Sequence, residues 1–202
     1  MAGMLIVNSS PRAKVSNSKK YIEIFKSFYS GDVFEYNANT KDPKNALKVI
    51  GQSTDMLLVF GLYVDSLPQS LLSWLIELEN LTLSRKPVVH VIVNCGFLEP
   101  KQNYVAIEMI KLFCSQNGYT FGSSLSIGSG EAILTTPFAG LVKQKISKLR
   151  RAIKAQHPVS LKVTMPLTKG IFLSASKGYW INYGAKNNIT EQQMRTMLIE
   201  DN

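Results

Sequence analysis

Blocks of apolar residues alternate with longer amphipathic segments from the start of the chain to about Ala155. The runs MLLVFG and VVHVIVN are almost continuously apolar. Such runs are typical of strands that are buried on both faces of a parallel sheet. The strands that these apolar runs predict cover residues 4–8, 32–36, 55–61, 87–94 and 120–128.

The segments between the apolar runs have the periodicity of helices that are buried on one face. The segment after the first run places Tyr21, Phe25 and Phe28 on a single face. Asp42 and Pro43 form an N-cap followed by proline at the first helical position, which opens a further helix. The helices expected on these grounds cover residues 18–30, 42–52, 68–80, 104–117 and 137–155.

Regular alternation of strands and helices implies right-handed crossovers and a doubly wound α/β sheet. We therefore expect a three-layer α/β fold with a five-stranded parallel sheet in the order 2-1-3-4-5, formed by residues 1–156. Residues 157–202 are expected to be a C-terminal helical extension packed on the same domain. Thr190 and Gln193 read as a capping box before a last helix over residues 191–199.

The loop after the first strand has the residue types of an anion site. It brings the hydroxyls of Ser10, Ser16 and Ser18, the amide of Asn17 and the guanidinium of Arg12 to the start of a helix. The unpaired N–H groups and the dipole of a helix N-terminus favour a bound anion. The loop therefore indicates a phosphate site, whereas the plainer interpretation is a polar turn in which Asn17 or Ser18 caps the helix.

Three segments that a doubly wound sheet would bring to one edge carry a family resemblance. The segment from Ser9 to Arg12, followed after three residues by Ser16-Asn17-Ser18, resembles the G-S-P-R-x-x-x-[GS]-N-[ST] loop of the flavodoxin-like NAD(P)H-dependent FMN reductases. The run from Gly61 to Pro68 is similar to the second loop of that family, and the run from Asn94 to Glu99 is similar to its third loop. Two positions depart from the pattern, because Ser9 replaces a usual glycine and Gly61 a common proline.

The resemblance implies a flavodoxin-like fold, FMN as cofactor and NAD(P)H as electron donor. It implies an enzyme that transfers hydride from NAD(P)H to a small acceptor, namely a quinone, a nitro or azo compound, or a flavin. By the same resemblance, the FMN phosphate would be held by Ser10, Arg12, Ser16, Asn17 and Ser18. The ring would be clasped by Gly61, Leu62, Tyr63, Asp65, Ser66, Leu67, Asn94, Cys95, Gly96 and Phe97. No catalytic side chain is named, because the cofactor carries out the chemistry.

Two other functions remain open on the sequence. The first is a flavodoxin-like electron carrier, which would by resemblance be acidic, whereas this chain has a net charge of +9. The second is a non-enzymatic binding module that has kept the scaffold and lost FMN. For Asp65, two roles are equally open: a bond to the flavin, or capping of the next helix together with Ser66.

Composition and residue spacing argue against several classes of binding partner. The basic run from Lys143 to Lys154 contains Ile146, Leu149 and Ile153 at helical spacing, which indicates the solvated face of an amphipathic helix rather than a nucleic-acid surface. Two cysteines and two histidines make neither a metal set nor a disulfide framework. No apolar run has the length of a membrane span, and the start does not resemble a signal peptide, so we expect a cytoplasmic protein. The resemblance leaves a homodimer open.

The two cysteines and His90 have plain interpretations as well. Cys95 stands at a strand end, where a lone cysteine is more often a small packed residue than a redox group. His90 lies inside an apolar run and is expected to be a buried or edge histidine with a local partner.

Overall fold

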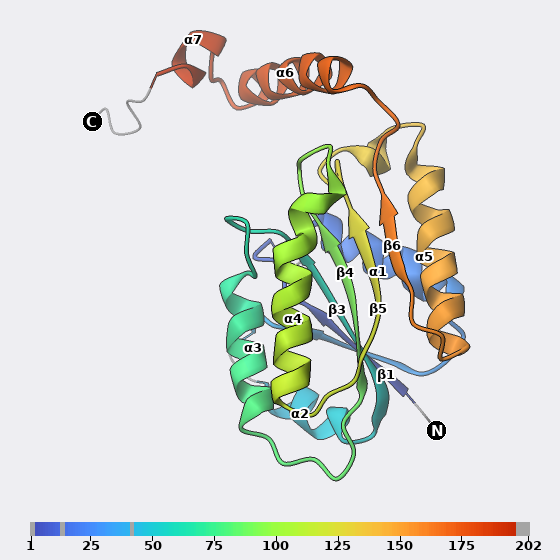
Figure 1. Ribbon diagram of the computed structural model, residues 1–202. Helices are drawn as coiled ribbons and strands as arrows, with labels where there is room; N and C mark the ends of the chain where they lie inside the picture. Colours follow the sequence, from blue (N-terminus) through green and yellow to red (C-terminus); the bar gives the residue numbers. More distant parts are fainter. Residues whose placement is uncertain (1–2, 13–14, 41–42, 197–202) are drawn as a thin grey trace. The chain divides into compact units, whose positions relative to one another are not determined.

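The computed structural model describes residues 3–12, 15–40 and 43–196 and divides into two units, Met1–Met165 and Pro166–Asn202. The first unit is built on a parallel sheet with the strand order β2-β1-β3-β4-β5-β6 (Figure 1). Its strands are β1 (Gly3–Asn8), β2 (Val33–Asn37), β3 (Ser53–Gly61), β4 (Val88–Asn94), β5 (Phe121–Ile127) and β6 (Ser160–Val163). The α/β class, the five expected strands and their relative order are confirmed.

The sheet has six strands and not the expected five, because β6 pairs in parallel with the outer side of β5. This strand was not predicted, because it is only four residues long and lies between Pro158 and Pro166. Prolines are tolerated beside an edge strand, which has one side without a partner to hydrogen-bond. Leu161 and Val163 alternate with exposed residues, as expected at an edge. Strand β6 carries the first unit to Met165, beyond the expected boundary at residue 156.

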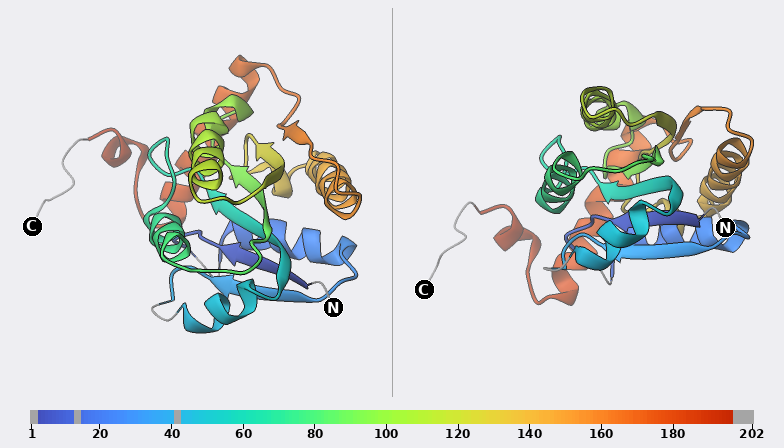
Figure 2. Two further views of the ribbon diagram at one scale, coloured as in Figure 1. Left: turned by 60° about the horizontal axis from the view of Figure 1, so that its bottom comes forward. Right: turned by 90° about the horizontal axis from the view of Figure 1, so that it is seen from below.

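Helices cover both faces of the sheet (Figures 1 and 2). The helices α2 (Lys44–Ile50), α3 (Gln69–Glu79) and α4 (Tyr104–Gln116) contribute to one buried cluster with the strands. The helices α1 (Asn17–Phe28) and α5 (Ala139–Lys154) contact each other on the other face. Short 3-10 turns, η1 (Pro100–Asn103) and η2 (Ile133–Thr135), precede α4 and α5. Pro43 is the N-cap of α2, and Asp42 lies outside the described residues.

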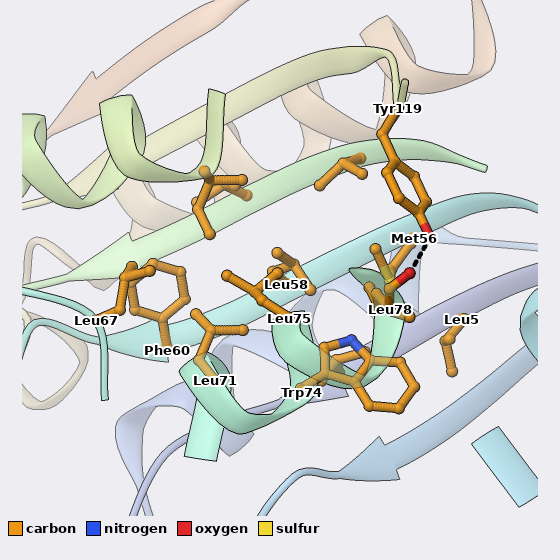
Figure 3. Packing of buried hydrophobic residues seen from close by; sticks show 14 of the residues in the cluster. Leu5, Met56, Leu58, Phe60, Leu67, Leu71, Trp74, Leu75, Leu78 and Tyr119 are labelled. Carbon is orange, nitrogen blue, oxygen red and sulfur yellow. Dashed lines mark hydrogen bonds between the residues drawn. The ribbon is translucent and has the colours of Figure 1, made fainter. Parts of the chain in front are cut away.

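The buried cluster between the sheet and α3 fixes this layer (Figure 3). Leu58 and Phe60 of β3 have no exposed surface and pack with Leu71 and Leu75 of α3. Burying one such side chain contributes about 1.5–3 kcal/mol, so the layer is held mainly by the hydrophobic effect. The hydroxyl of Tyr119 donates to the Leu78 carbonyl at 3.5 Å, which satisfies the one polar atom of that ring.

The amino ends of β3 and β4 hold a polar pair formed by a buried histidine and a partly buried aspartate. His90 is 4% exposed, its Nε2 lies 3.0 Å from Asp55 Oδ1, and its Nδ1 accepts the backbone N–H of Ser123 at 2.9 Å. Burial raises the pKa of the Asp55 carboxyl, but hydrogen bonds from His90 and Thr54 outweigh it and hold that pKa below its usual value. The expectation of a buried histidine with a local partner is confirmed.

The second unit contains α6 (Lys169–Lys186) and α7 (Glu191–Met194). The capping box of Thr190 and Gln193 is confirmed, since each residue's side chain bonds the other's backbone N–H. Helix α7 ends at Met194, and the expected continuation past Thr196 lies outside the described residues. The packing of this unit on the first stays a prediction.

A helical extension was expected over residues 157–202, but the bounds of α6 were not predicted, because its apolar residues do not form a single face. Tyr179, Trp180 and Tyr183 contact one another on this helix, with ring centroids 5.1 to 6.3 Å apart. The only residue of α6 that is buried among those described is Gly184. Within the described part of the chain, no helix combines the length and apolarity needed to cross a membrane.

Replacing Gly122 with alanine tests the packing around the His90 pair. An alanine Cβ would lie 2.4 Å from His90 Cε1 and 2.8 Å from a Val88 methyl carbon. His90 is held by two hydrogen bonds and cannot move away cheaply, so we expect Gly122→Ala to lower the free energy of unfolding by about 1–3 kcal/mol. Urea denaturation followed by circular dichroism measures this change.

Gly140 provides the matched control, because nothing lies within 4 Å of a Cβ added in α5. Gly140 lies in the first turn of α5, so Gly140→Ala should leave the free energy of unfolding unchanged or raise it by at most about 0.5 kcal/mol through helix propensity. Equal stability of Gly122→Ala and the wild-type protein would contradict the packing described for His90.

Candidate functional site

The carboxyl ends of the central strands bring three loops to one edge of the sheet. Strand β1 lies between β2 and β3. The sheet therefore first grows from β1 to β2 on one side, and β3 then adds to the other side of β1. The loops after β1, β3 and β4 begin beyond Asn8, Gly61 and Asn94. This reversal of strand order is where open α/β sheets bind ligands.

A hollow of about 230 Å³ opens between these loops. It is lined by Ser10, Pro11, Arg12, Ser16, Asn17, Ser18, Gly61, Leu62, Tyr63, Asn94, Cys95, Gly96 and Glu131. The structure thus brings together all of the predicted phosphate-loop residues and six from the other two loops. Asp65, Ser66, Leu67 and Phe97 are not among the lining residues, and Pro11 and Glu131 were not predicted.

Helix α1 begins where the first loop ends. Ser16 is its N-cap, with extended backbone and a side chain that accepts the Lys19 N–H at 3.1 Å. The expectation that Asn17 or Ser18 caps the helix is wrong by one or two positions. The cap leaves Asn17 and Ser18 in the first turn, where helix N–H groups lack intrahelical acceptors. Their side chains therefore stand beside a ready set of backbone donors.

Asn94 connects the strand ends to the first loop. It is 8% exposed, and its amide donates to the Phe60 carbonyl at 3.0 Å and to the Ser18 hydroxyl at 3.4 Å. The backbone of Gly130 lies so close that an added Cβ would be 2.8 Å from Asn94 Cβ. The structure therefore gives Asn94 a bracing role, and direct contact with a ligand stays a prediction.

Glu131 is the residue that the sequence analysis missed. Its carboxylate lies 3.5 Å from Arg12 Nη1, and it accepts the Asn17 amide at 3.3 Å. The same amide donates to the Glu131 carbonyl at 3.3 Å. Two donors of the predicted phosphate loop thus already contact an oxyanion. The sequence contained a signal for this residue. Glu131 comes just after the fifth predicted strand, and the carboxyl end of that strand must lie at the same edge of the sheet as the three loops.

The turn that carries Glu131 is anchored on several sides. The Gly130 N–H donates to the Cys95 carbonyl at 2.7 Å, and its carbonyl accepts the Tyr21 hydroxyl at 2.9 Å. Burial, with a smaller contribution from Glu131, raises the pKa of Tyr21, so this hydroxyl stays a donor. Ser129 adopts a φ of 53°, which turns the chain sharply between β5 and Glu131. The backbone of Glu131 is therefore fixed at the rim of the hollow.

The second loop forms a two-residue turn. Tyr63 and Ser66 exchange backbone hydrogen bonds at 3.1 and 3.0 Å. Val64 and Asp65 between them have φ values of 48° and 54°. Left-handed backbone at a β-branched residue costs on the order of 1–3 kcal/mol, so the turn holds Val64 in a strained conformation. The N-cap of helix α3 is Pro68, so neither Asp65 nor Ser66 occupies the capping position.

The remaining predicted ring contacts lie around the hollow rather than in its lining. Leu67 is 5% exposed and belongs to the core cluster, and the Ser66 hydroxyl lies 3.6 Å from Met109 Sδ. Phe97 is more than half exposed, as is Tyr63, which does line the hollow. Their contact with a ligand ring stays a prediction.

Cys95 is a packed residue at the base of the hollow. It is 4% exposed, and its sulfur lies 3.8 Å from the carbonyl oxygens of Phe97 and Glu99. Burial raises the pKa of the thiol to about 11. The thiolate is therefore scarce near neutral pH, which favours packing over a redox role.

Known proteins resemble this chain in its fold and not in its sequence. No protein-family model and no curated protein matches the chain. A flavodoxin from Streptococcus pneumonia TIGR4 matches with a TM-score of 0.56 and 14% identity, over 77% of this chain and 99% of that one. The chain has the flavodoxin-like fold. A sequence identity of 14% supports a shared fold and not a shared function.

Two further solved structures of the same fold are named for redox activities. An FMN-dependent NADH-azoreductase from Bacillus anthracis str. Ames Ancestor, in complex with FMN, matches with a TM-score of 0.55 and 14% identity, over 76% of this chain and 99% of that one. An NAD(P)H:quinone oxidoreductase from Methanothermobacter marburgensis matches with a TM-score of 0.53 and 12% identity, over 75% of this chain and 94% of that one.

Alkylation tests the packed state of Cys95. A pKa of about 11 instead of 9.0 lowers the thiolate fraction on the order of a hundredfold at pH 8. We expect iodoacetamide to modify Cys95 at least that much more slowly in the native protein than in urea, because burial also limits access. Peptide mass spectrometry measures both rates. Similar rates in the two states would contradict the buried thiol.

Proposed function

We propose that the protein is an FMN-dependent oxidoreductase that transfers hydride from NAD(P)H to a small acceptor, namely a quinone, a nitro or azo compound, or a flavin. The observation that carries the proposal is the pair of contacts from Arg12 and Asn17 to the Glu131 carboxylate. These donors already hold an oxyanion at the start of α1, at the point where the strand order reverses. A phosphate needs the same donors in the same place.

The chemistry of the donor set fits the phosphate of FMN. Arg12 supplies charge-assisted bonds, the Asn17 amide and the hydroxyls of Ser10, Ser16 and Ser18 supply polar contacts, and the first turn of α1 supplies N–H groups. Ser10 has its own N–H bonded to Asn8 Oδ1 at 3.2 Å, which fixes the backbone at Ser10 before any ligand arrives.

The second and third loops offer the surface for the flavin ring. Leu62, Tyr63, Cys95 and Gly96 line the part of the hollow that these loops form. Nothing lies within 4 Å of a Cβ position at Gly96, so a planar group can approach the backbone there. When bound, FMN supplies the hydride-accepting centre, whereas these residues orient the ring and keep water from one side of it.

The structural neighbours support this proposal by their printed activities. One is described as an FMN-dependent NADH-azoreductase and another as an NAD(P)H:quinone oxidoreductase. We extend NAD(P)H and a small-molecule acceptor to this chain on that basis. A cytoplasmic location and a homodimer remain expectations from the sequence.

An electron carrier without a small substrate is the second candidate. It is favoured by the flavodoxin among the structural neighbours. The net charge of +9 counts against it, since carrier flavodoxins are by resemblance acidic.

The deciding experiment combines FMN titration with turnover. We expect the purified protein to bind FMN, with quenching of flavin fluorescence, and to oxidise NADH or NADPH in the presence of a quinone or azo dye. Binding of FMN without turnover of any acceptor would favour the electron carrier. Absence of FMN binding would overturn the proposed function and favour the module that has lost its flavin.

Replacing Arg12 with alanine tests the phosphate contact. We expect Arg12→Ala to weaken FMN binding by roughly 1.5–3 kcal/mol, because a hydrogen bond to a charged group is lost. Riboflavin lacks the phosphate, so its affinity should stay within about twofold of the wild-type value. Fluorescence titration with both flavins measures the two affinities.

Arg151→Ala is the matched control, since Arg151 is an exposed arginine on α5 that does not line the hollow. This control should leave FMN binding unchanged. Equal FMN affinity of Arg12→Ala and the wild-type protein would refute the role of Arg12.

A further inference from the structure

We propose that Glu131 is an internal anion that competes with the ligand's phosphate for Arg12 and Asn17, so that FMN is bound as an exchangeable ligand. This inference rests on the proposed function of the hollow. It assigns to Glu131 a role in selecting and releasing the flavin. No other described residue brings a negative charge to the lining of the hollow.

The contacts of Glu131 are those that a bound phosphate would use. The carboxylate lies 3.5 Å from Arg12 Nη1 and 3.3 Å from the Asn17 amide nitrogen. A carboxylate and a phosphate both present oxygen acceptors to these donors. Entry of the phosphate is therefore an exchange of one oxyanion for another rather than the filling of a vacant cation site.

The exchange itself is easy. The side chains of Arg12 and Glu131 are 72% and 38% exposed, and an ion pair in such a position is worth little because water screens it. A phosphate can therefore displace the carboxylate from the guanidinium. The cost of opening the ion pair does not by itself make the site weak.

Glu131 cannot leave the neighbourhood after it has been displaced. Its turn is held by the bond from Gly130 to the Cys95 carbonyl and by the bond from Tyr21 to the Gly130 carbonyl. Ala132 and Ile133 also donate to the Ser129 carbonyl, at 3.0 and 2.9 Å. Only the side chain can rotate, so its charge stays close to the phosphate.

The charges that line the hollow determine how strongly the nearby Glu131 carboxylate affects a bound phosphate. Arg12 is the only cation among the described lining residues, and Glu131 cancels its formal charge. A phosphate of nearly two negative charges, placed about 5 Å from a carboxylate in a watery site, is repelled enough to weaken binding about tenfold. A neutral flavin such as riboflavin escapes this repulsion. Glu131 thus reduces the advantage of FMN over riboflavin and speeds the release of FMN.

The test compares Glu131→Gln with the wild-type protein in titrations with FMN and riboflavin. Glutamine keeps the size of the side chain and an oxygen that can accept from Asn17, whereas it removes the charge. We expect FMN to bind about tenfold more tightly and to dissociate more slowly, with riboflavin affinity changed less than twofold. The gain for FMN should shrink at 0.5 M salt, because screening weakens the repulsion.

Two further variants complete the design. Glu79→Gln removes one negative charge from an exposed position at the end of α3, away from the hollow, and should leave both affinities unchanged. Glu131→Ala removes the charge and the hydrogen bond together and should also bind FMN more tightly. Thermal melting of each variant checks that it folds cooperatively, so that the affinities are compared between folded proteins.

The outcomes separate the inference from the proposed function. Unchanged or weaker FMN binding in both Glu131 variants, with binding by the wild-type protein, would overturn the inference and leave the function standing. An equal gain for riboflavin would also overturn it, because the effect would not act on the phosphate. Binding of FMN by neither the wild-type protein nor the variants would overturn the proposed function, and the inference with it. Binding only by the variants would support both.

Discussion

The shared edge formed by the carboxyl ends of parallel strands is the constraint on which the candidate site depends. Buried apolar strands force helices onto both faces of the sheet, and right-handed crossovers then return every loop of one kind to the same edge. Because β1 lies between β2 and β3, the loops after β1, β3 and β4 leave a hollow between them. The hydrophobic effect that builds the sheet thus also decides where polar residues can meet.

The polar groups at this edge are organised before any ligand is present. Asn94 bonds the end of β3 and the start of α1, and Ser10 has its backbone N–H fixed by Asn8. The buried hydroxyl of Tyr21 donates to the carbonyl of Gly130. A site that is already ordered spends less conformational entropy when it binds. This rigidity supports the view that the hollow is a binding site and not an ordinary set of loops.

The same rigidity creates a conflict of charge. The loop gathers donors for an anion, and the turn after β5 supplies an anion of its own through Glu131. Pairing the loop with a carboxylate satisfies donors that would otherwise face water, and it makes any incoming phosphate meet a like charge. If the hollow binds FMN as proposed, its affinity would reflect a balance between the donors and Glu131 rather than the donor count alone. Such a balance is what the proposed exchange of the flavin requires.

Most of the fold followed from the sequence, because local patterns encode it. The apolar runs fixed β1 to β5 within two residues, and the helical periodicity fixed α1 to α5, since burial on one or two faces leaves a regular trace. The short edge strand β6 was not predicted, because four residues between prolines are too few to show a clear alternation of apolar and polar positions. The bounds of helix α6 were not predicted for a related reason. Among the described residues only Gly184 of this helix is buried, so its sequence has no buried apolar face to mark it.

The sequence by itself determined which polar residues the first loop carries and the edge of the sheet where they lie, because residue type and strand direction suffice for both. Tertiary structure alone decided that Ser16 caps α1, that Leu67 turns into the core, and that Glu131 contacts Arg12. These outcomes depend on the position of side chains far apart in the chain. Glu131 follows Arg12 by more than half of the chain, and the two charges meet only because the strands before them, β5 and β1, belong to one folded sheet.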